Sequence, residues 1–306
     1  MFPIIPAASA AAETGNDEGI FGYGSPYVSM SNLVSNTGVV ATDVTGVGTD
    51  RQGPAATQYG GDKGIFAFGR TASLVYTAVS NLVSDAGVIA SDTSGVGTAR
   101  GYLAGCSFGE DEGIFGGGYE YPGSGSVNYF STTNLVSNAG VVASDTAGVM
   151  TARSYPSACE FGEDKGIFGF GTTSGGVTGI TNLVSNTGVV ASDTAAVGTA
   201  RDNMAACSFG GDKGIFAYGN EGVGGVATSN LVSNTGVIAS DVASAGTARY
   251  ALAACEYGGD KGIFGFKDSG GKGSMTNLVS NTGVIASDQA AETGTARGYL
   301  AACSFN

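Results

Sequence analysis

Apolar side chains along this chain occur in short runs of five to seven residues, and each run is bounded by Gly, Asn or Asp. Residues 201–248 show this pattern clearly: a small-residue run is followed by GIFAYG, then TSNLVSN, then GVIASDV. Runs of this length with such boundaries predict four short β-strands. The Asn-Thr-Gly step between the last two runs predicts a tight hairpin, because Gly adopts positive φ without strain.

The same succession of runs returns six times, at a spacing of about 45 to 53 residues. Each copy contains a GIFGFG-like run, a TNLVSNTGVVASD-like run, and GTAR followed by small residues. The central run begins in its six copies at Asn32, Asn81, Asn134, Asn182, Asn230 and Asn277. A period of this length is typical of solenoids, propellers and other arrays.

The size of the side chains increases across the four predicted strands, from Ala and Ser in the first to Leu, Val and Ile in the last two. Adjacent apolar pairs, Leu231-Val232 and Val237-Ile238, indicate that the last two strands are buried on both faces. A wedge-shaped sheet that packs between two neighbours fits this gradient. The sequence therefore predicts an all-β fold, a six-bladed β-propeller with four antiparallel strands in each blade.

The two ends of the chain favour a closed ring. The chain begins with the last three strands of a unit, at Gly19, and ends with an isolated first strand in residues 297–306. We expect this final strand to join the first blade, which would hide the exposed sheet edges. The expected domains are an extended N-terminal arm, residues 1–16, and the propeller, residues 17–306.

Composition narrows the possible functions. The net charge of −13 argues against nucleic-acid binding, since phosphate contacts require Lys and Arg. We expect no membrane insertion, because no apolar stretch approaches the 18 residues of a spanning helix. Only 13% of the residues are charged, which indicates either an uncharged polar surface or one covered by neighbours in an assembly.

The N-terminal arm lacks Lys and Arg, and its apolar patch is interrupted by Pro3 and Pro6. These features argue against a signal peptide, although the ASA triplet keeps secretion open. We expect Phe2, Ile4 and Ile5 to dock on another protein.

The five cysteines all lie six residues after the repeat Arg, where the second unit has Thr57. Equivalent positions on neighbouring blades rarely come within the roughly 7 Å between Cα atoms that a disulfide needs. We therefore expect small buried apolar side chains rather than metal or redox sites. The cysteines are Cys106, Cys159, Cys207, Cys255 and Cys303.

The repeat loosely resembles the kelch arrangement of an Arg, small residues and Ile-Phe-x-aromatic-Gly. It is more similar to DKGIFGYG and TNLVSNTGVVATD repeats of tail-fibre and other virion proteins of tailed, often marine, bacteriophages. The matching sequences are DKGIFGFG at residues 164–171 and TNLVSNTGVVASDTAAVGTAR at residues 181–201. Glu18 and Glu112 depart from this motif, which has Lys. The resemblance implies a virion role, with residues 1–16 contacting other virion proteins.

The loops between the second and third strands vary most in length, and the longest spans residues 119–133. Length variation on one face of a repeat protein commonly indicates a binding face, although tolerated insertions remain an alternative. Aromatic residues among Gly and Ser suit an adaptable recognition surface for a host glycan or protein. The candidate binding residues are Tyr27, Tyr76, Tyr119, Tyr121, Tyr129 and Phe130.

Two further sets of residues repeat sixfold, and we expect both to be structural. An Asp in the turn after the first strand, such as Asp164, suits turn chemistry better than a metal site. An Asp lies eight or nine residues before each repeat Arg, which suggests an ion pair between blades. These residues are Asp43, Asp92, Asp145, Asp193, Asp241 and Asp288, with Arg51, Arg100, Arg153, Arg201, Arg249 and Arg297.

The chain contains no histidine, which excludes Ser-His-Asp and Cys-His catalysis and most zinc sites. We expect no enzymatic activity and no cofactor. Two functions remain: a virion component that presents its loops to the host or a partner, and a secreted, lectin-like propeller located outside the cell.

Overall fold

The computed structural model describes residues 17–123, 125–289 and 294–305, and all its regular secondary structure there is β. The predicted all-β class is therefore confirmed. In this part of the chain the strands form six principal antiparallel sheets, which we number 1 to 6 in chain order, and two short hairpins.

Each principal sheet has an inner, a middle and an outer strand. In that order, sheet 1 contains β23 (Ala301–Phe305), β1 (Glu18–Gly24) and β2 (Val28–Val34), and sheet 2 contains β3 (Ala55–Tyr59), β4 (Lys63–Ala67) and β5 (Ser80–Val83). Sheet 3 contains β6 (Ala104–Phe108), β7 (Glu112–Gly116) and β10 (Thr133–Val136), and sheet 4 contains β11 (Ser157–Phe161), β12 (Lys165–Gly169) and β15 (Thr181–Val184). Sheet 5 contains β16 (Ala205–Phe209), β17 (Lys213–Ala217) and β18 (Thr228–Val232), and sheet 6 contains β20 (Ala253–Tyr257), β21 (Lys261–Asp268) and β22 (Lys272–Val279). The hairpins are β8 (Tyr119–Glu120) with β9 (Asn128–Tyr129), and β13 (Thr172–Thr173) with β14 (Gly176–Val177).

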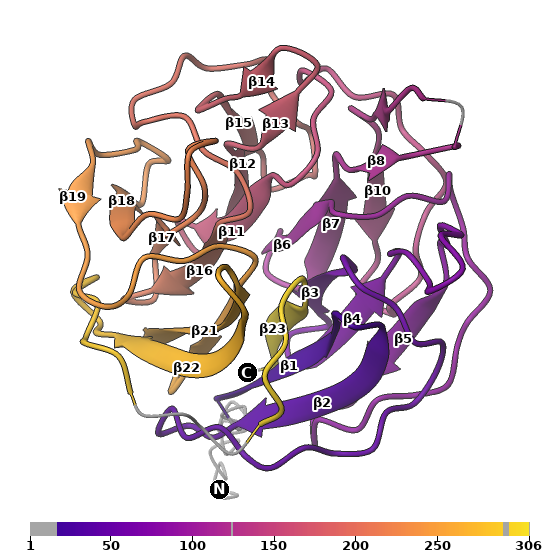
Figure 1. Ribbon diagram of the computed structural model, residues 1–306, viewed down its shortest axis with the longest axis horizontal. Coiled ribbons are helices and arrows are strands. Elements are labelled where there is room, and N and C mark those ends of the chain that lie inside the picture. The colour runs from indigo at the N-terminus through magenta and orange to yellow at the C-terminus, as the bar shows by residue number, and fades with distance from the viewer. Residues whose placement is uncertain (1–16, 124, 290–293, 306) are drawn as a thin grey trace, which may run out of the picture.

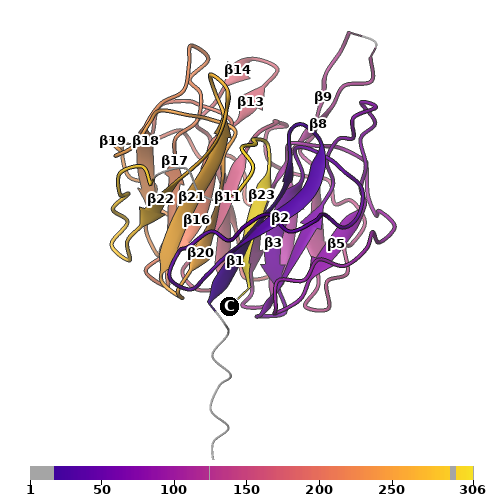
Figure 2. The ribbon, with the colours of Figure 1, turned by 60° about the horizontal axis from the view of Figure 1, so that its bottom comes forward.

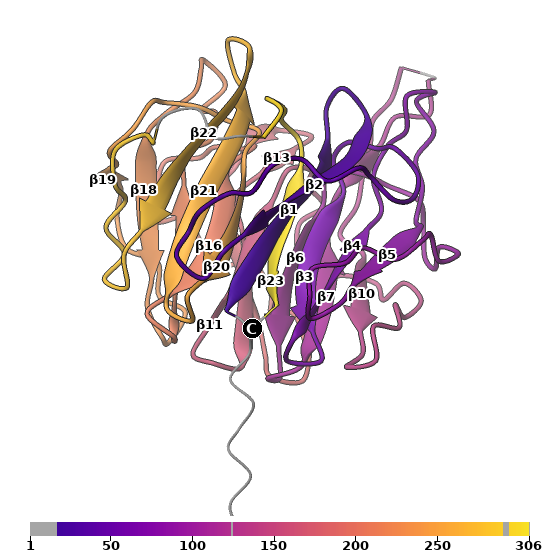
Figure 3. The ribbon, with the colours of Figure 1, turned by 90° about the horizontal axis from the view of Figure 1, so that it is seen from below.

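The sheets are set around a common centre, with their inner strands nearest to it (Figure 1). Each inner strand contacts the inner strands of two other sheets: β3 lies between β23 and β6, and β20 lies between β16 and β23. In side view the strands run between two opposite faces of the molecule (Figure 3). A narrow channel lined by the inner strands therefore follows the centre.

Both ends of the chain contribute to sheet 1. Strand β23 pairs with β1, so that Ile20 lies opposite Cys303 and Phe21 lies opposite Ala302. The predicted pairing between the last strand and the first sheet is present in the structure. The predicted arm, residues 1–16, and Asn306 lie outside the described residues.

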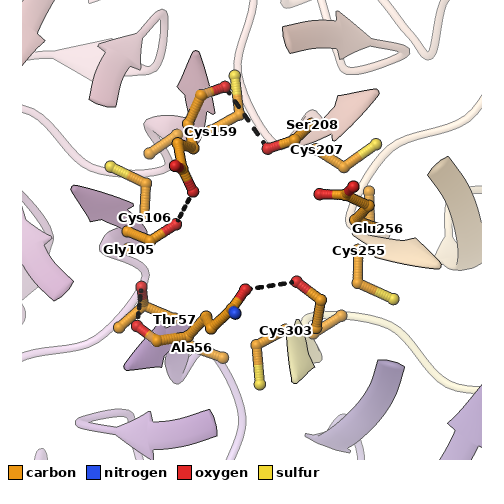
Figure 4. Close-up of a pocket in the computed structure, with 17 residues that line it drawn as sticks. Ala56, Thr57, Gly105, Cys106, Cys159, Cys207, Ser208, Cys255, Glu256 and Cys303 are labelled. Atoms are coloured by element: carbon orange, nitrogen blue, oxygen red, sulfur yellow. Dashed lines mark hydrogen bonds between the residues drawn. The ribbon is translucent and has the colours of Figure 1, made fainter. Parts of the chain in front are cut away.

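Glycines in the middle strands allow neighbouring sheets to approach closely. A Cβ atom at Gly166 would lie 2.6 Å from the Sγ atom of Cys106 on the preceding sheet. Thr57 makes the equivalent contact with Gly113, its Cγ2 atom being 2.7 Å from the position of a Cβ. The cysteine side chains point away from the channel, as Figure 4 shows, and all five are buried and free. The prediction that they are small buried apolar side chains is confirmed.

The prediction of four strands in every unit needs a correction. Along the described chain only sheet 5 has a fourth strand, β19 (Val242–Ala243). Elsewhere the outermost segment forms isolated bridges to the outer strand, as Val34 with Val40 and Ser31 with Val44 do in sheet 1. The second bridge is one residue out of register with the first, so an extra residue bulges between them. This bulge interrupts the ladder, and Asp43, which lies within it, accepts hydrogen bonds from Thr295 in the crossing that precedes sheet 1.

The prediction that the outermost segment is buried on both faces is also wrong. Val237 is 64% exposed, whereas the next residue, Ile238, is 7% exposed. The segment lies at the outer edge of its sheet, so the neighbouring sheet covers only one side of it.

The two faces of the molecule carry different connections. The turn face carries the turns between inner and middle strands and the Asn-Thr-Gly hairpins. In the first of these hairpins Gly38 has the predicted positive φ (79°), and its N–H donates to the Ser35 carbonyl at 2.8 Å. The loop face carries the connections from middle to outer strands and the crossings between sheets. The β8–β9 and β13–β14 hairpins rise on the loop face, opposite the C-terminal end of β23 (Figure 2).

Candidate binding face

Each crossing between sheets ends in an arginine that is completely buried. Arg51 lies 4.0 Å above the Tyr23 ring of sheet 1, and its Nη2 atom donates to Asn81 of sheet 2 at 2.7 Å. The arginine thus fills the space between two sheets, and each packing partner comes from a different sheet. Burial lowers the pKa of these guanidinium groups, for example that of Arg100 to about 10.

The sequence suggested a pair between each arginine and the Asp that precedes it by eight or nine residues. The structure does not contain this pair among the residues it describes. Arg51 instead lies 4.0 Å from Asp92, which belongs to sheet 2. Each Asp lies in the bulge described above and faces the preceding crossing. Each arginine therefore pairs with the Asp of the following sheet and not with the Asp that is nearest in sequence. The same pairing at 3.8 Å joins Arg297 to Asp43 and so connects the last crossing with sheet 1.

A buried asparagine donates a hydrogen bond to the Asp of each of these ion pairs. In sheet 4, Asn182 accepts a hydrogen bond from Arg153 at 2.7 Å and donates to Asp193 at 2.9 Å. The Asp193 carboxylate also accepts hydrogen bonds from the backbone N–H and hydroxyl of Thr151. Although burial alone would raise it, these hydrogen bonds lower the pKa of Asp193. The network is thus a hydrogen-bonded polar cluster between sheets, in which the Nε atom of Arg153 is left without a partner.

Sheet 3 departs from this arrangement where Gly117 replaces the usual Phe or Tyr. Met150 stands in the crossing that follows sheet 3, where other units have Gly, such as Gly246, which lies against the Tyr218 hydroxyl. Met150 is buried, and its Cε atom lies close to Gly116. The methionine therefore occupies the volume that the missing ring leaves.

A ring of six residues with positive φ surrounds the channel at the loop face. Five of the six are not glycine, which is uncommon for left-handed backbone. Backbone hydrogen bonds connect them, for example from Tyr102 N–H to the Gly53 carbonyl at 2.7 Å and from Tyr155 N–H to the Tyr102 carbonyl at 2.8 Å. The six residues are Gly53, Tyr102, Tyr155, Asn203, Ala251 and Tyr299.

Three tyrosines of this ring belong to a larger aromatic cluster on the loop face. Tyr102 stacks on Tyr119 with ring centroids 5.1 Å apart and packs against Tyr155 at 4.8 Å. Tyr76 lies 5.9 Å from Tyr119, and Tyr299 lies 5.6 Å from Tyr102. The cluster therefore combines loop residues that the sequence predicted with crossing residues that it did not.

The other predicted loop residues lie around this cluster. The Tyr27 hydroxyl accepts a hydrogen bond from Arg70 Nη2 at 2.8 Å. Tyr121 is exposed in the β8–β9 hairpin, Tyr129 is half-buried there, and half-buried Phe130 lies 6.0 Å from the Arg100 guanidinium. Tyr76 is buried, so it supports the face from below.

Beneath the ring of positive-φ residues lies an axial hollow of about 70 Å³. Tyr102, Tyr155 and Tyr299 line one side of its rim, and the smaller Asn203 and Ala251 line the other. Its floor is apolar and is formed by Leu103, Met204, Leu252 and Leu300. The hollow combines an aromatic rim, a carboxamide and an aliphatic floor.

The other end of the channel is acidic. A mouth of about 230 Å³ on the turn face is lined by Glu160 and Glu256 from the inner strands and by Glu110, Glu163 and Asp212 from the turns. Burial raises the pKa of Glu160 to about 7 and that of Glu256 to about 8. Figure 4 shows the Glu256 carboxylate pointing into the channel.

The turn-face Asp residues make local contacts. Asn234 of the hairpin turn donates to Asp212 at 3.0 Å, and the Asp212 carbonyl accepts from Gly162 of the preceding sheet at 2.8 Å. Among the described residues no group of three or more His, Cys, Asp or Glu side chains is placed to hold a metal ion.

The chain matches no protein-family model and no curated protein. The described residues contain no helix long and apolar enough to cross a membrane.

Proposed function

We propose that the six sheets form a closed six-bladed β-propeller, which serves as a non-catalytic binding component of a tailed-bacteriophage virion, in a tail fibre or a related surface structure. The propeller is supported by the contacts among inner strands and by the β1–β23 pairing. The virion role is supported by the resemblance of the repeat to phage virion proteins.

One observation carries the proposed binding role: the aromatic side chains gather on the face where the repeats differ most. The outer motif with Asn182 and Asp193 recurs almost unchanged in every unit, whereas the middle-to-outer connections differ in length and composition. Their aromatic residues belong to sheets 1, 2 and 3, so one half of the loop face is aromatic. Rigid aromatic side chains supply contact area at low entropic cost, which suits recognition of a host glycan or protein.

A secreted lectin-like propeller is the second candidate, because the same aromatic cluster would also bind glycans outside a virion. The two candidates differ in where the chain is found. Mass spectrometry of gradient-purified virions from cells that express the chain should detect it at a fixed ratio to the major capsid protein. Recovery only in the particle-free medium would overturn the virion role.

Attachment of the loop face to the host is tested separately. The fluorescently labelled chain should bind host cells, and Tyr121→Ser combined with Tyr129→Ser should reduce this binding. Val237→Thr, a polar substitution at an exposed position of the outer edge, is the control and should leave binding unchanged. Equal binding by both variants would contradict a role for the loop face. Deletion of residues 1–16 should leave cell binding intact and remove the chain from purified particles.

A further inference from the structure

The axial hollow contains a polar atom that lacks a partner: the Oδ1 atom of Asn203, which lines the hollow, is buried without a hydrogen bond. The Oδ1 atom of Asp202, the preceding residue in the chain, is also buried without a partner, although Asp202 does not line the hollow. The second carboxylate oxygen of Asp202 accepts from the Thr172 hydroxyl. Buried acceptors are nearly always satisfied in folded proteins. The Asn203 atom therefore points to a donor that is supplied from outside the chain, at the loop-face end of the channel.

The size of the hollow restricts what can enter it. Pockets that enclose a whole drug-sized ligand measure about 300–1,000 Å³. A hollow of about 70 Å³ therefore admits a single substituent, while the rest of the ligand stays outside against the rim. The aliphatic floor, with Leu252 and Leu300, favours a methyl group at the deepest point.

We propose that this hollow binds the acetamido group of an N-acetylated sugar. The methyl group lies on the aliphatic floor, and the amide N–H donates to Asn203 Oδ1. The pyranose ring lies outside against Tyr155 and Tyr299, which are half-buried and offer part of their surface. An acetamido group carries a methyl group, which suits the aliphatic floor, and an amide N–H, which suits the Asn203 carboxamide.

The alternative occupants fit less well. A carboxylate or phosphate would face the unpartnered Asn203 acceptor and the net charge of −13. An unsubstituted hexose has no methyl group to cover the floor. This proposal rests on the proposed function, because it names the class of ligand that the loop face binds. Its test does not depend on the virion role, since sugar binding is measured on the isolated chain.

The chain itself suggests a variant that fills the hollow. Ala251 has φ 58°, and Tyr102, Tyr155 and Tyr299 hold the equivalent positions with φ of 56°, 51° and 52°. Ala251→Tyr therefore introduces a side chain that this backbone position already carries three times. Asn203→Ala is the second variant, because Ala251 shows that alanine also suits the position. Ala286→Tyr, on the exposed outer edge, is the matched control.

Binding is measured by calorimetry and saturation-transfer NMR with full-length protein. The probes are the trimer of N-acetylglucosamine, its deacetylated form and the glucose trimer. We expect the acetylated trimer to bind best, with its acetamido methyl most strongly saturated. Ala251→Tyr should weaken binding at least tenfold, Asn203→Ala should also weaken it, and Ala286→Tyr should not.

Three outcomes overturn the inference: no binding of the acetylated trimer, equal binding of all three sugars, or unchanged affinity in both hollow variants. Should Ala251→Tyr fail to fold, as judged by its thermal melt, Asn203→Ala decides the question. Failure of sugar binding together with loop-dependent host attachment would leave the proposed function standing. Sugar binding by a chain that is missing from virions would instead refute the virion role alone.

Discussion

At the scale of single residues, the molecule places a full positive charge between every pair of neighbouring sheets. A buried charge is costly unless it is paired and hydrogen-bonded. Arg201, for example, is held by the Phe170 ring, by Asn230 and by the partly exposed carboxylate of Asp241. The asparagine joins the two charges, so its loss affects both.

Replacement of Asn182 by alanine should destabilise the protein by roughly 3 kcal/mol, because it leaves the Arg153 guanidinium and Asp193 without their shared partner. Urea denaturation measures the change. Asn128→Ala, at an exposed position in β9, is the control and should stay within about 0.5 kcal/mol of the wild type. Equal effects of the two substitutions would show that the buried network contributes nothing.

The two channel glutamates should make stability depend on pH. Because burial raises the pKa of Glu256 from 4.5 to about 8, the folded state keeps a proton that the unfolded state releases above pH 4.5. The free energy of unfolding therefore falls as the pH rises from 4.5 to about 8, and it stays constant above that pH. Glu256→Gln should stabilise the protein at pH 9 by on the order of 2 kcal/mol, and little at pH 4.

Thermal melts at pH 4 and pH 9 test this expectation. Glu120→Gln, in the β8–β9 hairpin, should show no such difference between the two pH values. A gain from Glu256→Gln that is the same at both pH values would mean that ionisation is not its cause.

At the scale of strands, neighbouring sheets pack closely because small residues face one another between them. The Sγ atom of each cysteine stands against a glycine of the next middle strand, and the fit leaves no room for a methyl group, as at Gly214 and Cys159. Close-packed interiors tolerate added volume poorly. A residue pair, rather than either residue alone, therefore sets the distance between sheets.

Gly166→Ala should destabilise the protein by about 1–3 kcal/mol, because the new Cβ would lie 2.6 Å from Cys106 Sγ. Adding Cys106→Ala should recover part of this loss, which a double-mutant cycle measures. Gly175→Ala, which meets only ordinary contacts in the β13–β14 turn, is the control. Strict additivity of the two changes would contradict the proposed contact.

The strand pattern could be predicted from the sequence because it follows from local runs and turns. The all-β class, the hairpin at Gly38 and the pairing of the final strand all follow from such signals. The true partner of Arg51 could not be predicted in this way, since a bulge in the next sheet brings Asp92 closer than Asp43. The Asn that recurs in an otherwise apolar run is the one signal in the sequence for the buried network.

The axial hollow had no comparable signal in the sequence. Its rim depends on left-handed backbone at Tyr102, Tyr155 and Tyr299, and tyrosine rarely adopts that conformation. The acidic channel mouth depends on which inner-strand residues face the centre, which the neighbouring sheets decide. Both features arise from the arrangement of all the sheets together.

At the scale of the whole molecule, β23 completes sheet 1 and lies between β3 and β20. Ending the chain after Gly298 should therefore abolish the cooperative melting transition and cause aggregation, because β1 loses its inner neighbour and its edge becomes available. Calorimetry and size-exclusion chromatography measure both effects.

Removal of residues 122–127, at the tip of the β8–β9 hairpin, is the control of similar length. This deletion leaves the principal sheets untouched and should change the melting temperature by only a few degrees. A chain that ends at Gly298 and melts like the wild type would show that β23 is dispensable.

The position of β23 also sets the order of events during synthesis. A ribosome adds about 5–20 residues per second, so β1 and β2 wait roughly 15–60 s before their last partner leaves the exit tunnel. Until then the nascent chain exposes an open edge at each end of its row of sheets. Sheet 1 is therefore complete only after β23 has been synthesised, and until then its open edge is available to a strand of another copy.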